Sequence, residues 1–217
     1  MVSLRFTLVS DGSSDRCLIP ILEWLLRESG HAKSVDARWA DFSFGTKPRG
    51  LVDRLDRALR LYPCDVLFIH RDAEGQDSTL RYEEVTEALA NVSAGNVPPA
   101  VCVIPVRMQE AWLLFDERAI RSAAGNPHGR EELALPKPSE IEAIPDPKAM
   151  LHGLLRKACG LSGRRLKKFA AAKASLLITQ YADDFSKLRA LPAFQRLERD
   201  VSALRDADWK RIPSAGA

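Results

Sequence analysis

The chain has 217 residues, of which 46% are hydrophobic and 28% charged, and its formal net charge is +3. This balance is typical of a globular protein and excludes a disordered or fibrous chain, while so small a net charge does not by itself indicate nucleic-acid binding. The longest apolar runs, such as residues 17–22 and 100–106, are far shorter than the roughly 20 residues that a membrane-spanning helix needs.

The N-terminal half alternates between strand-like and helix-like segments. Residues 4–9 open the pattern as a strand. The N-terminal sequence MVSLRFTLVSDG has no basic region followed by an apolar stretch and a small-residue cleavage site, so we expect a strand there rather than a signal peptide. In the next segment Leu18, Leu22 and Leu25 recur at spacings of four and three, which predicts a helix. The predicted strands cover residues 4–9, 35–42, 65–70 and 101–106, and the predicted helices cover residues 14–27, 51–59 and 80–90.

This order of elements predicts an α/β fold. Strands that alternate with helices favour an open, mostly parallel, Rossmann-like sheet that is flanked by helices. Residues 65–70 are almost wholly apolar, as expected of a central strand covered on both faces. In such sheets ligands bind outside the carboxyl ends of the strands.

The pattern changes after residue 120. We predict an α/β core in residues 1–120, an irregular connection rich in Gly and Pro in residues 121–147, and a helical extension in residues 148–210 that packs on the core. Within the extension, the helices are expected at residues 148–158, 164–178 and 190–204.

Three of the predicted strands lead into acidic residues. The first leads to Asp11 and Asp15, the third to Asp72 and Glu74, and the fourth to Glu110. Adjacent parallel strands would gather these carboxylates at one edge of the sheet, where they would repel one another unless a cation lay among them. Mg²⁺, or Mn²⁺ in its place, accepts such oxygen ligands and can activate water for attack on a phosphodiester.

Each acidic residue also has a purely structural interpretation. Asp11 and Gly12 form a common turn signal, and the acids around Ala73 suit a turn equally well. Glu110 opens a predicted helix, where the helix dipole favours a carboxylate. Trp112 beside it is most simply a core residue. The residues alone leave both interpretations open.

A basic stretch lies in the C-terminal third. No Asp or Glu occurs between residues 148 and 182, so the positive charges there are not balanced locally. If they share a face, they would bind the backbone of a nucleic acid, with DNA as the expected substrate and little base preference. The alternative is an ordinary solvated helix face. The candidate nucleic-acid-binding residues are Arg156, Lys157, Arg164, Arg165, Lys167, Lys168 and Lys173.

Cysteine and histidine do not indicate a further site. The four cysteines form no C-x-x-C pair, and the four histidines follow no ligand spacing. Scattered cysteines of this kind favour a reducing cytoplasm, which is the predicted location.

Several motifs resemble elements of TOPRIM domains, the catalytic fold shared by topoisomerases, primases and overcoming-lysogenization-defect (OLD) nucleases. Residues 11–15, Asp-Gly-Ser-Ser-Asp, resemble the Glu-Gly-x-Ser/Thr-Asp element, and residues 72–75, Asp-Ala-Glu-Gly, resemble the Asp-x-Asp element. Residues 110–116 are similar to the Glu-Ala-Trp-(Leu/Phe)-Leu-x-Asp signature of a bacterial TOPRIM-like family, whose helical tail begins near an Asp-Pro-Lys, present here at residues 146–148. The resemblance covers about residues 4–205.

The resemblance implies a Mg²⁺-dependent nuclease with Asp11, Asp72 and Glu74 as catalytic and metal-binding residues, and with Asp15 and Glu110 as supporting or additional acids. Asp11 stands for the usual glutamate and reaches about 1.5 Å less far, while Glu74 is longer than the usual aspartate. Members of the family are often encoded beside AAA or ABC-type ATPases in settings that suggest defence against phage.

The leading hypothesis is therefore a nuclease that acts as the effector subunit of an ATPase-linked anti-phage system. The alternative is a catalytically degenerate TOPRIM-like adaptor or sensor that binds a partner ATPase. Whether the chain forms a homo-oligomer is left open by the sequence. Phosphotransfer or nucleotidyl transfer ranks third, because Gly12 is the only glycine in its turn and neither a P-loop nor a dinucleotide fingerprint is present.

Overall fold

The computed structural model describes residues 3–44 and 46–204, and these divide into two compact units. Unit 1 contains the described residues up to Arg71 together with residues 77–104 and 196–204, and unit 2 contains residues 72–76 and 105–195. Residues 205–210 of the predicted helical extension lie outside the described residues.

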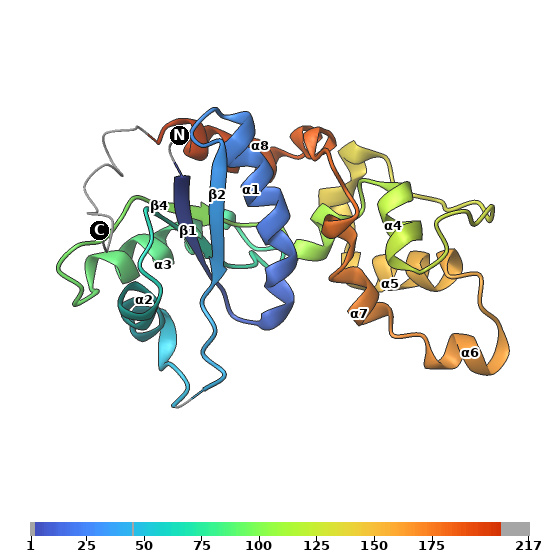
Figure 1. Cartoon of the computed structure of the whole chain (residues 1–217), viewed down its shortest axis with the longest axis horizontal. Helices are drawn as coiled ribbons and strands as arrows, with labels where there is room; N and C mark the ends of the chain where they lie inside the picture. Colours follow the sequence, from blue (N-terminus) through green and yellow to red (C-terminus); the bar gives the residue numbers. More distant parts are fainter. Residues whose placement is uncertain (1–2, 45, 205–217) are drawn as a thin grey trace. The chain divides into compact units, whose positions relative to one another are not determined.

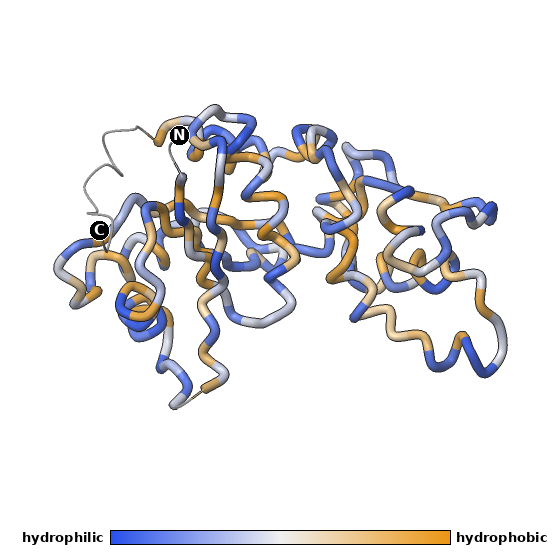
Figure 2. Tube along the Cα trace, viewed as in Figure 1, coloured by the Kyte–Doolittle hydropathy of each residue, from blue (hydrophilic) through white to orange (hydrophobic). Residues whose placement is uncertain are grey.

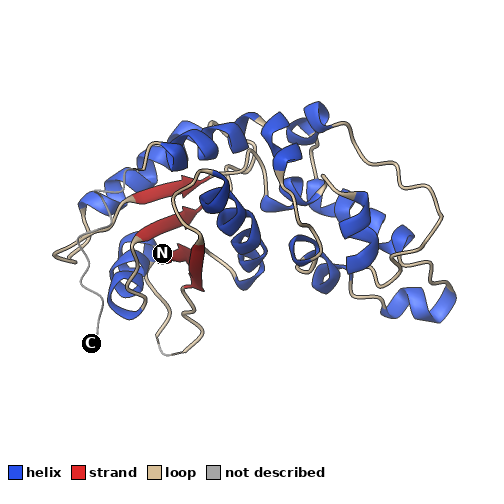
Figure 3. Cartoon of the chain, turned by 45° about the horizontal axis from the view of Figure 1, so that its top comes forward, coloured by secondary structure: helices blue, strands red, loops and turns tan. Residues whose placement is uncertain are grey.

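Unit 1 contains a four-stranded sheet in which all strands are parallel (Figure 1). Its strands are β1 (Ser3–Val9), β2 (Ser34–Trp39), β3 (Val66–His70) and β4 (Ala100–Val103), in the order β2-β1-β3-β4. Helices α1 (Ile19–Glu28), α2 (Gly50–Leu61) and α3 (Ser78–Ala90) flank the sheet (Figure 3). The predicted α/β, Rossmann-like fold class is confirmed.

The ends of β1 and β3 lie side by side. Val9 pairs with Ile69 in parallel register, so the residues that follow the two strands emerge at the same edge. The chain continues from β1 to β2 on one side and returns to β3 on the other, which makes the junction of β1 and β3 a topological switch point. In open parallel sheets such junctions are where ligands bind.

Burial explains why these residues form this sheet. All five residues of β3 are buried, as a central strand requires, whereas the edge strand β2 alternates between exposed and partly buried residues. On one face, the side chains of the sheet pack against α2 and α3 through a cluster that includes Val9, Leu67, Ile69, Leu55, Ala58, Val85 and Ala88. Figure 2 shows hydrophilic as well as apolar residues along β2, as expected of an edge strand.

The helix predicted at residues 14–27 begins with a tighter turn. A 3₁₀ helix, η1 (Ser13–Leu18), precedes α1. Pro20 lies in the first turn of α1, where its missing N–H costs nothing and its fixed φ suits a helix start. The α-helix therefore starts at Ile19, and the residues before it are left to the loop that follows β1.

Unit 2 is helical. It contains η2 (Gln109–Leu113), α4 (Glu117–Ala123), η3 (Pro138–Ala143), α5 (Pro147–Ala158), α6 (Gly163–Lys168), α7 (Ala171–Ser175), η4 (Ile178–Gln180), η5 (Ser186–Ala190) and the first residues of α8 (Pro192–Ser202).

The single helix predicted at residues 164–178 is wrong, because the structure has α6, α7 and η4 in its place. The break lies at Phe169 and Ala170, whose ψ angles of 120° and 77° are not helical. All six residues of α6 are partly or fully exposed. This helix therefore lacks the buried residues that stabilise the longer helix α5. Short helices depend on packing for most of their stability.

Among the helices in the described part of the chain, none is both long enough and apolar enough to cross a membrane.

Candidate functional site

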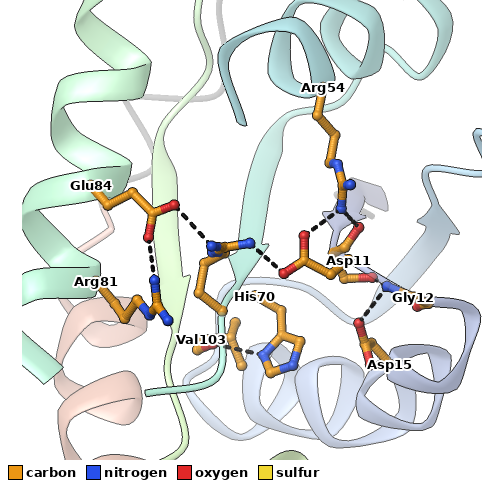
Figure 4. Close-up of polar contacts among 10 residues, drawn as sticks. Asp11, Gly12, Asp15, Arg54, His70, Arg81, Glu84 and Val103 are labelled. Carbon is orange, nitrogen blue, oxygen red and sulfur yellow. Dashed lines mark hydrogen bonds and ion pairs between the residues drawn. The ribbon is translucent and has the colours of Figure 1, made fainter. Parts of the chain in front are cut away.

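The carboxylate of Asp11, in the loop directly after β1, is held by two arginines (Figure 4). Arg54 Nη1, on α2, lies 2.6 Å from Asp11 Oδ1, and Arg71 Nη1, directly after β3, pairs with Asp11 Oδ2. Arg54 Nη1 also donates to the backbone oxygen of Ser10 at 2.5 Å. One carboxylate and one arginine thus join the two strands that flank the switch point.

The network continues from Arg71 to α3. Arg71 Nη2 lies 2.9 Å from Glu84 Oε1, and Glu84 Oε2 lies 2.9 Å from Arg81 Nη1. Three guanidinium groups and two carboxylates therefore alternate, and these five side chains carry a formal charge of +1. We call them the switch-point network.

Exposure differs within the switch-point network. The side chain of Asp11 is 56% exposed, whereas those of Arg54 and Arg71 are only 19% and 20% exposed. A charged ligand that arrives from solvent would therefore meet the Asp11 carboxylate first, with the two guanidinium groups held in place behind it. Asp11 is their present counter-ion, and another anion would have to compete with it.

His70 fixes the end of β3, from which Arg71 emerges. Its ring is buried, and Nδ1 lies 2.9 Å from the carbonyl oxygen of Val103 on β4. His70 therefore has a structural role: it joins the end of β3 to β4 next to the switch-point network.

Asp15 stabilises the turn that carries Asp11. The N–H of Gly12 donates to Asp15 Oδ2 at 3.0 Å, and Ser14 Oγ donates to Oδ1 at 3.0 Å. Asp15 is 5% exposed and stands at the third position of η1. An acid at this position that bonds back to the cap residue is half of a capping box.

Asp72 and Glu74 belong to unit 2. Asp72 directly precedes a tight turn of residues 73–76, and Glu74 lies within this turn. The N–H of Gln76 donates to the carbonyl of Ala73 at 2.9 Å, and the two central residues, Glu74 and Gly75, have φ angles of 54° and 77°. Positive φ at both central residues defines a type I′ turn. Glu74 is exposed and Asp72 is half-buried.

Glu110, on η2, is almost fully buried and lies beside basic residues of α5. Its Oε1 is 3.4 Å from Lys148 Nζ. Burial lowers the pKa of His152, one turn along α5, below its ordinary value of 6.5; the Lys148 ammonium lowers it further, and the Glu110 carboxylate partly offsets both effects. The expectation that Trp112 is a core residue is confirmed, since its ring is buried 5.5 Å from that of Phe194, between centroids.

The basic residues occupy three helices of unit 2. Arg156 and Lys157 end α5, Lys173 lies on α7, and all three are exposed. The four basic residues of α6 fall within an arc of about 160° around the helix axis, with Leu166 opposite. The basic surface of α6 consists of Arg164, Arg165, Lys167 and Lys168, all of which are exposed.

The predicted acids differ in how well they fit a metal ion. Both oxygens of Asp11 accept from arginines, both oxygens of Asp15 accept from the turn, and Glu110 is paired with Lys148. In residues 3–44 and 46–204 no group of three or more His, Cys, Asp and Glu side chains is arranged to hold a metal. Asp11 and Asp15, as they are bonded here, do not fit a cation.

The sequence interpretation missed the partners of Asp11. Arg71 stands directly before Asp72 in the chain, and its position after a predicted central strand was a signal that could have been used. Arg54 lies on α2, one of several arginines on that helix, and nothing in the local spacing distinguishes it. Glu84 and Arg81 on α3 carry no local signal either.

Comparison of the chain with protein-family models, with curated proteins and with solved structures finds no match.

Proposed function

We propose that this protein hydrolyses phosphodiester bonds of nucleic acid at the carboxyl edge of its parallel sheet. The observation that carries the proposal is the switch-point network, in which Asp11 and Arg71 follow neighbouring strands and are bonded to each other. Ligands bind at this position in parallel sheets, and the guanidinium groups of Arg54 and Arg71 favour an anion there.

Arg54 and Arg71 bind a phosphate group in this proposal. Guanidinium groups bind phosphate oxygens through two parallel hydrogen bonds, and both arginines are already held in place by the backbone and by α3. A phosphate that takes over these donors releases Asp11, whose carboxylate is then free to accept a proton or to orient water.

Asp72 and Glu74 are the proposed ligands for Mg²⁺, for which Mn²⁺ can substitute. Their carboxylate oxygens are the ligand type that Mg²⁺ prefers, and Glu74 is exposed to solvent. When bound, the ion would neutralise charge on a phosphate group that it coordinates and would lower the pKa of a coordinated water.

The basic surface of α6, with Arg156, Lys157 and Lys173, supplies the contacts to the rest of the nucleic acid, which we take to be DNA. Lysine and arginine side chains on an exposed surface bind phosphates without reading the base sequence. Figure 2 shows the hydrophilic character of α6, whose basic residues are all exposed.

The TOPRIM resemblance extends the proposal to a biological setting. The protein would be the nuclease effector of an ATPase-linked system of antiviral defence in the cytoplasm, with an AAA or ABC-type ATPase as its partner. Free thiols at Cys17, Cys64, Cys102 and Cys159 are compatible with a reducing compartment.

The experiment that tests the activity is a cleavage assay on labelled DNA and RNA, with Mg²⁺ or EDTA, for the wild type and Asp72→Ala. Cleavage that needs Mg²⁺ and is lost in the variant supports the proposal. Equal cleavage by both proteins, or none by either, counts against it.

A second function is favoured by one observation, the complete pairing of the Asp11 carboxylate with arginines. A site whose own carboxylate is already paired with arginines suits a non-catalytic adaptor or sensor that binds a partner ATPase. Co-purification from the native host tests this alternative. It is supported if an ATPase complex forms and its protective activity survives replacement of Asp72 and Glu74, and it is rejected if protection is lost.

A further inference from the structure

A second arginine-containing element lies within unit 2, at the turn formed by residues 73–76. The turn is fixed by three backbone hydrogen bonds to the segment after β4: Ala73 N–H to Pro105 O at 3.1 Å, Glu74 N–H to Arg107 O at 3.1 Å, and Gly75 N–H to Val106 O at 2.8 Å. The backbone of Arg107 is therefore part of the support of this turn.

The side chain of Arg107 lies directly on Gly75. A Cβ atom built on Gly75 would stand 2.8 Å from Arg107 Nη1 and 3.2 Å from Cζ. Glycine suits this position for two reasons: its φ of 77° is in the left-handed region, and a side chain here would force the end of the Arg107 side chain to move. The contact places the positive charge of Arg107 against the turn that carries Glu74.

The side chain of Arg107 is the second observation. Throughout the part of the chain that the structure describes, its side chain makes no hydrogen bond or ion pair, and its Nε atom is buried without an acceptor. By contrast, Arg54 and Arg71 are paired with carboxylates. A buried Nε–H group without an acceptor is unfavourable unless a ligand supplies one.

We infer that Arg107 binds a phosphate group of the substrate and holds it against the turn that carries Asp72 and Glu74. The guanidinium group offers a planar fork that matches the oxygens of an anion such as phosphate. Phosphate is also the anion that a nucleic-acid substrate presents to a binding surface. The identity of the phosphate as part of a nucleic acid rests on the proposed function.

Gly75 is the second participant, because it leaves the space that the guanidinium group occupies. Gly75→Ala should displace the Arg107 side chain without removing its charge. This variant tests whether phosphate binding depends on the position of the guanidinium group. A substitution that removes the charge of Arg107 cannot test this, because it removes the group altogether.

The test is a titration of the full isotope-labelled chain with inorganic phosphate, followed through the arginine Nε–H resonances. In the wild type, we expect one resonance, absent from the spectrum of Arg107→Lys, to move to saturation as phosphate is added. Arg107→Lys should weaken phosphate binding by about tenfold or more, because a hydrogen bond to a charged group is lost. Arg130→Lys, at an exposed arginine of the same unit, is the matched control and should leave the affinity unchanged.

The inference is overturned if no arginine Nε resonance of the wild type responds to phosphate, or if Arg130→Lys weakens binding as much as Arg107→Lys. Circular dichroism checks that the variants fold. If Arg107→Lys does not fold, Gly75→Ala replaces it, and full retention of phosphate affinity in that variant contradicts the inference.

The result of the phosphate-binding test can be distinguished from the result of the nuclease test. Phosphate binding at Arg107 in a protein that cleaves no nucleic acid keeps this inference and rejects the nuclease. Cleavage by Arg107→Lys with an unchanged KM keeps the nuclease and rejects the role of Arg107.

Discussion

Asp11 and Arg71 form an ion pair that joins the loop after β1 to the residue after β3. The pair spans the point at which the strand order of the sheet reverses, and Arg71 extends it to Glu84 on α3. A parallel sheet binds its ligands at this place, so the charges of this pair set which ligands the edge can accept.

Removing Arg71 should destabilise the fold as well as alter the site. Arg71→Gln leaves Asp11 with one partner and removes one partner of Glu84, and we expect a loss of about 1–2 kcal/mol of unfolding free energy. Because the side chain of Asp11 is 56% exposed, its own coupling to Arg71 should be only about 0.5–1 kcal/mol. Urea unfolding of wild type, Asp11→Asn, Arg71→Gln and the double variant measures this coupling. Strict additivity of the two single effects would show that the pair is not formed in solution.

Asp15 should behave as a residue of the turn rather than as a metal ligand. Asp15→Ala removes the acceptor for the Gly12 N–H and for Ser14 Oγ, and the loss of such a cap costs about 0.5–2 kcal/mol. Asp15→Asn, which keeps one acceptor oxygen, should cost less. Thermal unfolding with and without Mg²⁺ measures both effects. A stabilisation by Mg²⁺ that disappears in Asp15→Asn would instead make Asp15 a ligand.

The sequence predicted the sheet well because its inner strands are buried on both faces. Residues 4–9 and 65–70 were predicted as strands, and the structure has Ser3–Val9 and Val66–His70. A strand of this kind leaves a continuous apolar run that few other structures produce. The helix at residues 164–178 was predicted wrongly, since the spacing of its residues does not reveal that Ala171 and Ala174 are buried while α6 stays exposed.

The site was predicted less completely than the sheet. The position of Asp11 after a strand follows from the local sequence, but its partner Arg54 is 43 residues away. Arg54, Arg57 and Arg60 recur at every third residue of α2, and Arg57 pairs with Asp53 instead. Only the packing of α2 on the sheet decides which of these arginines reaches Asp11, and a single sequence contains no direct record of that packing.

The basic surface of α6 should contribute to DNA affinity without contributing to stability. Replacing its four basic residues with Gln should change the unfolding free energy by less than about 0.5 kcal/mol, because the side chains are exposed. The same change should reduce the slope of log affinity against log salt by up to about 0.9 per lost phosphate contact on duplex DNA. Fluorescence anisotropy over a salt series, with EDTA to prevent cleavage, measures the slope. The control is Lys33→Gln with Arg60→Gln, two exposed basic residues of unit 1, and an equal effect of this pair would remove the special role of α6.

His152 should make stability depend on pH. Its pKa in the folded protein is lowered, mainly by burial and then by Lys148, from an ordinary value of 6.5. The unfolded chain therefore binds more protons than the folded chain between the lowered pKa and 6.5, so stability rises as pH increases through this window and is lost as pH falls through it. Unfolding by urea from acidic to neutral pH should show this rise in the wild type and a smaller one in His152→Gln. Identical pH profiles of the two proteins would contradict the assignment.

The most direct measurement is the initial rate of DNA cleavage as a function of Mg²⁺ concentration for wild type, Asp72→Asn and Glu132→Gln. Glu132 is an exposed acid elsewhere in unit 2 and serves as the control. We predict that the wild type and Glu132→Gln cleave DNA at similar, saturable, Mg²⁺-dependent rates, and that Asp72→Asn is slower by about 10² to 10⁴ at every concentration. A wild-type rate that does not depend on Mg²⁺, or an Asp72→Asn rate equal to that of the control, would contradict the proposed Mg²⁺-dependent phosphodiesterase.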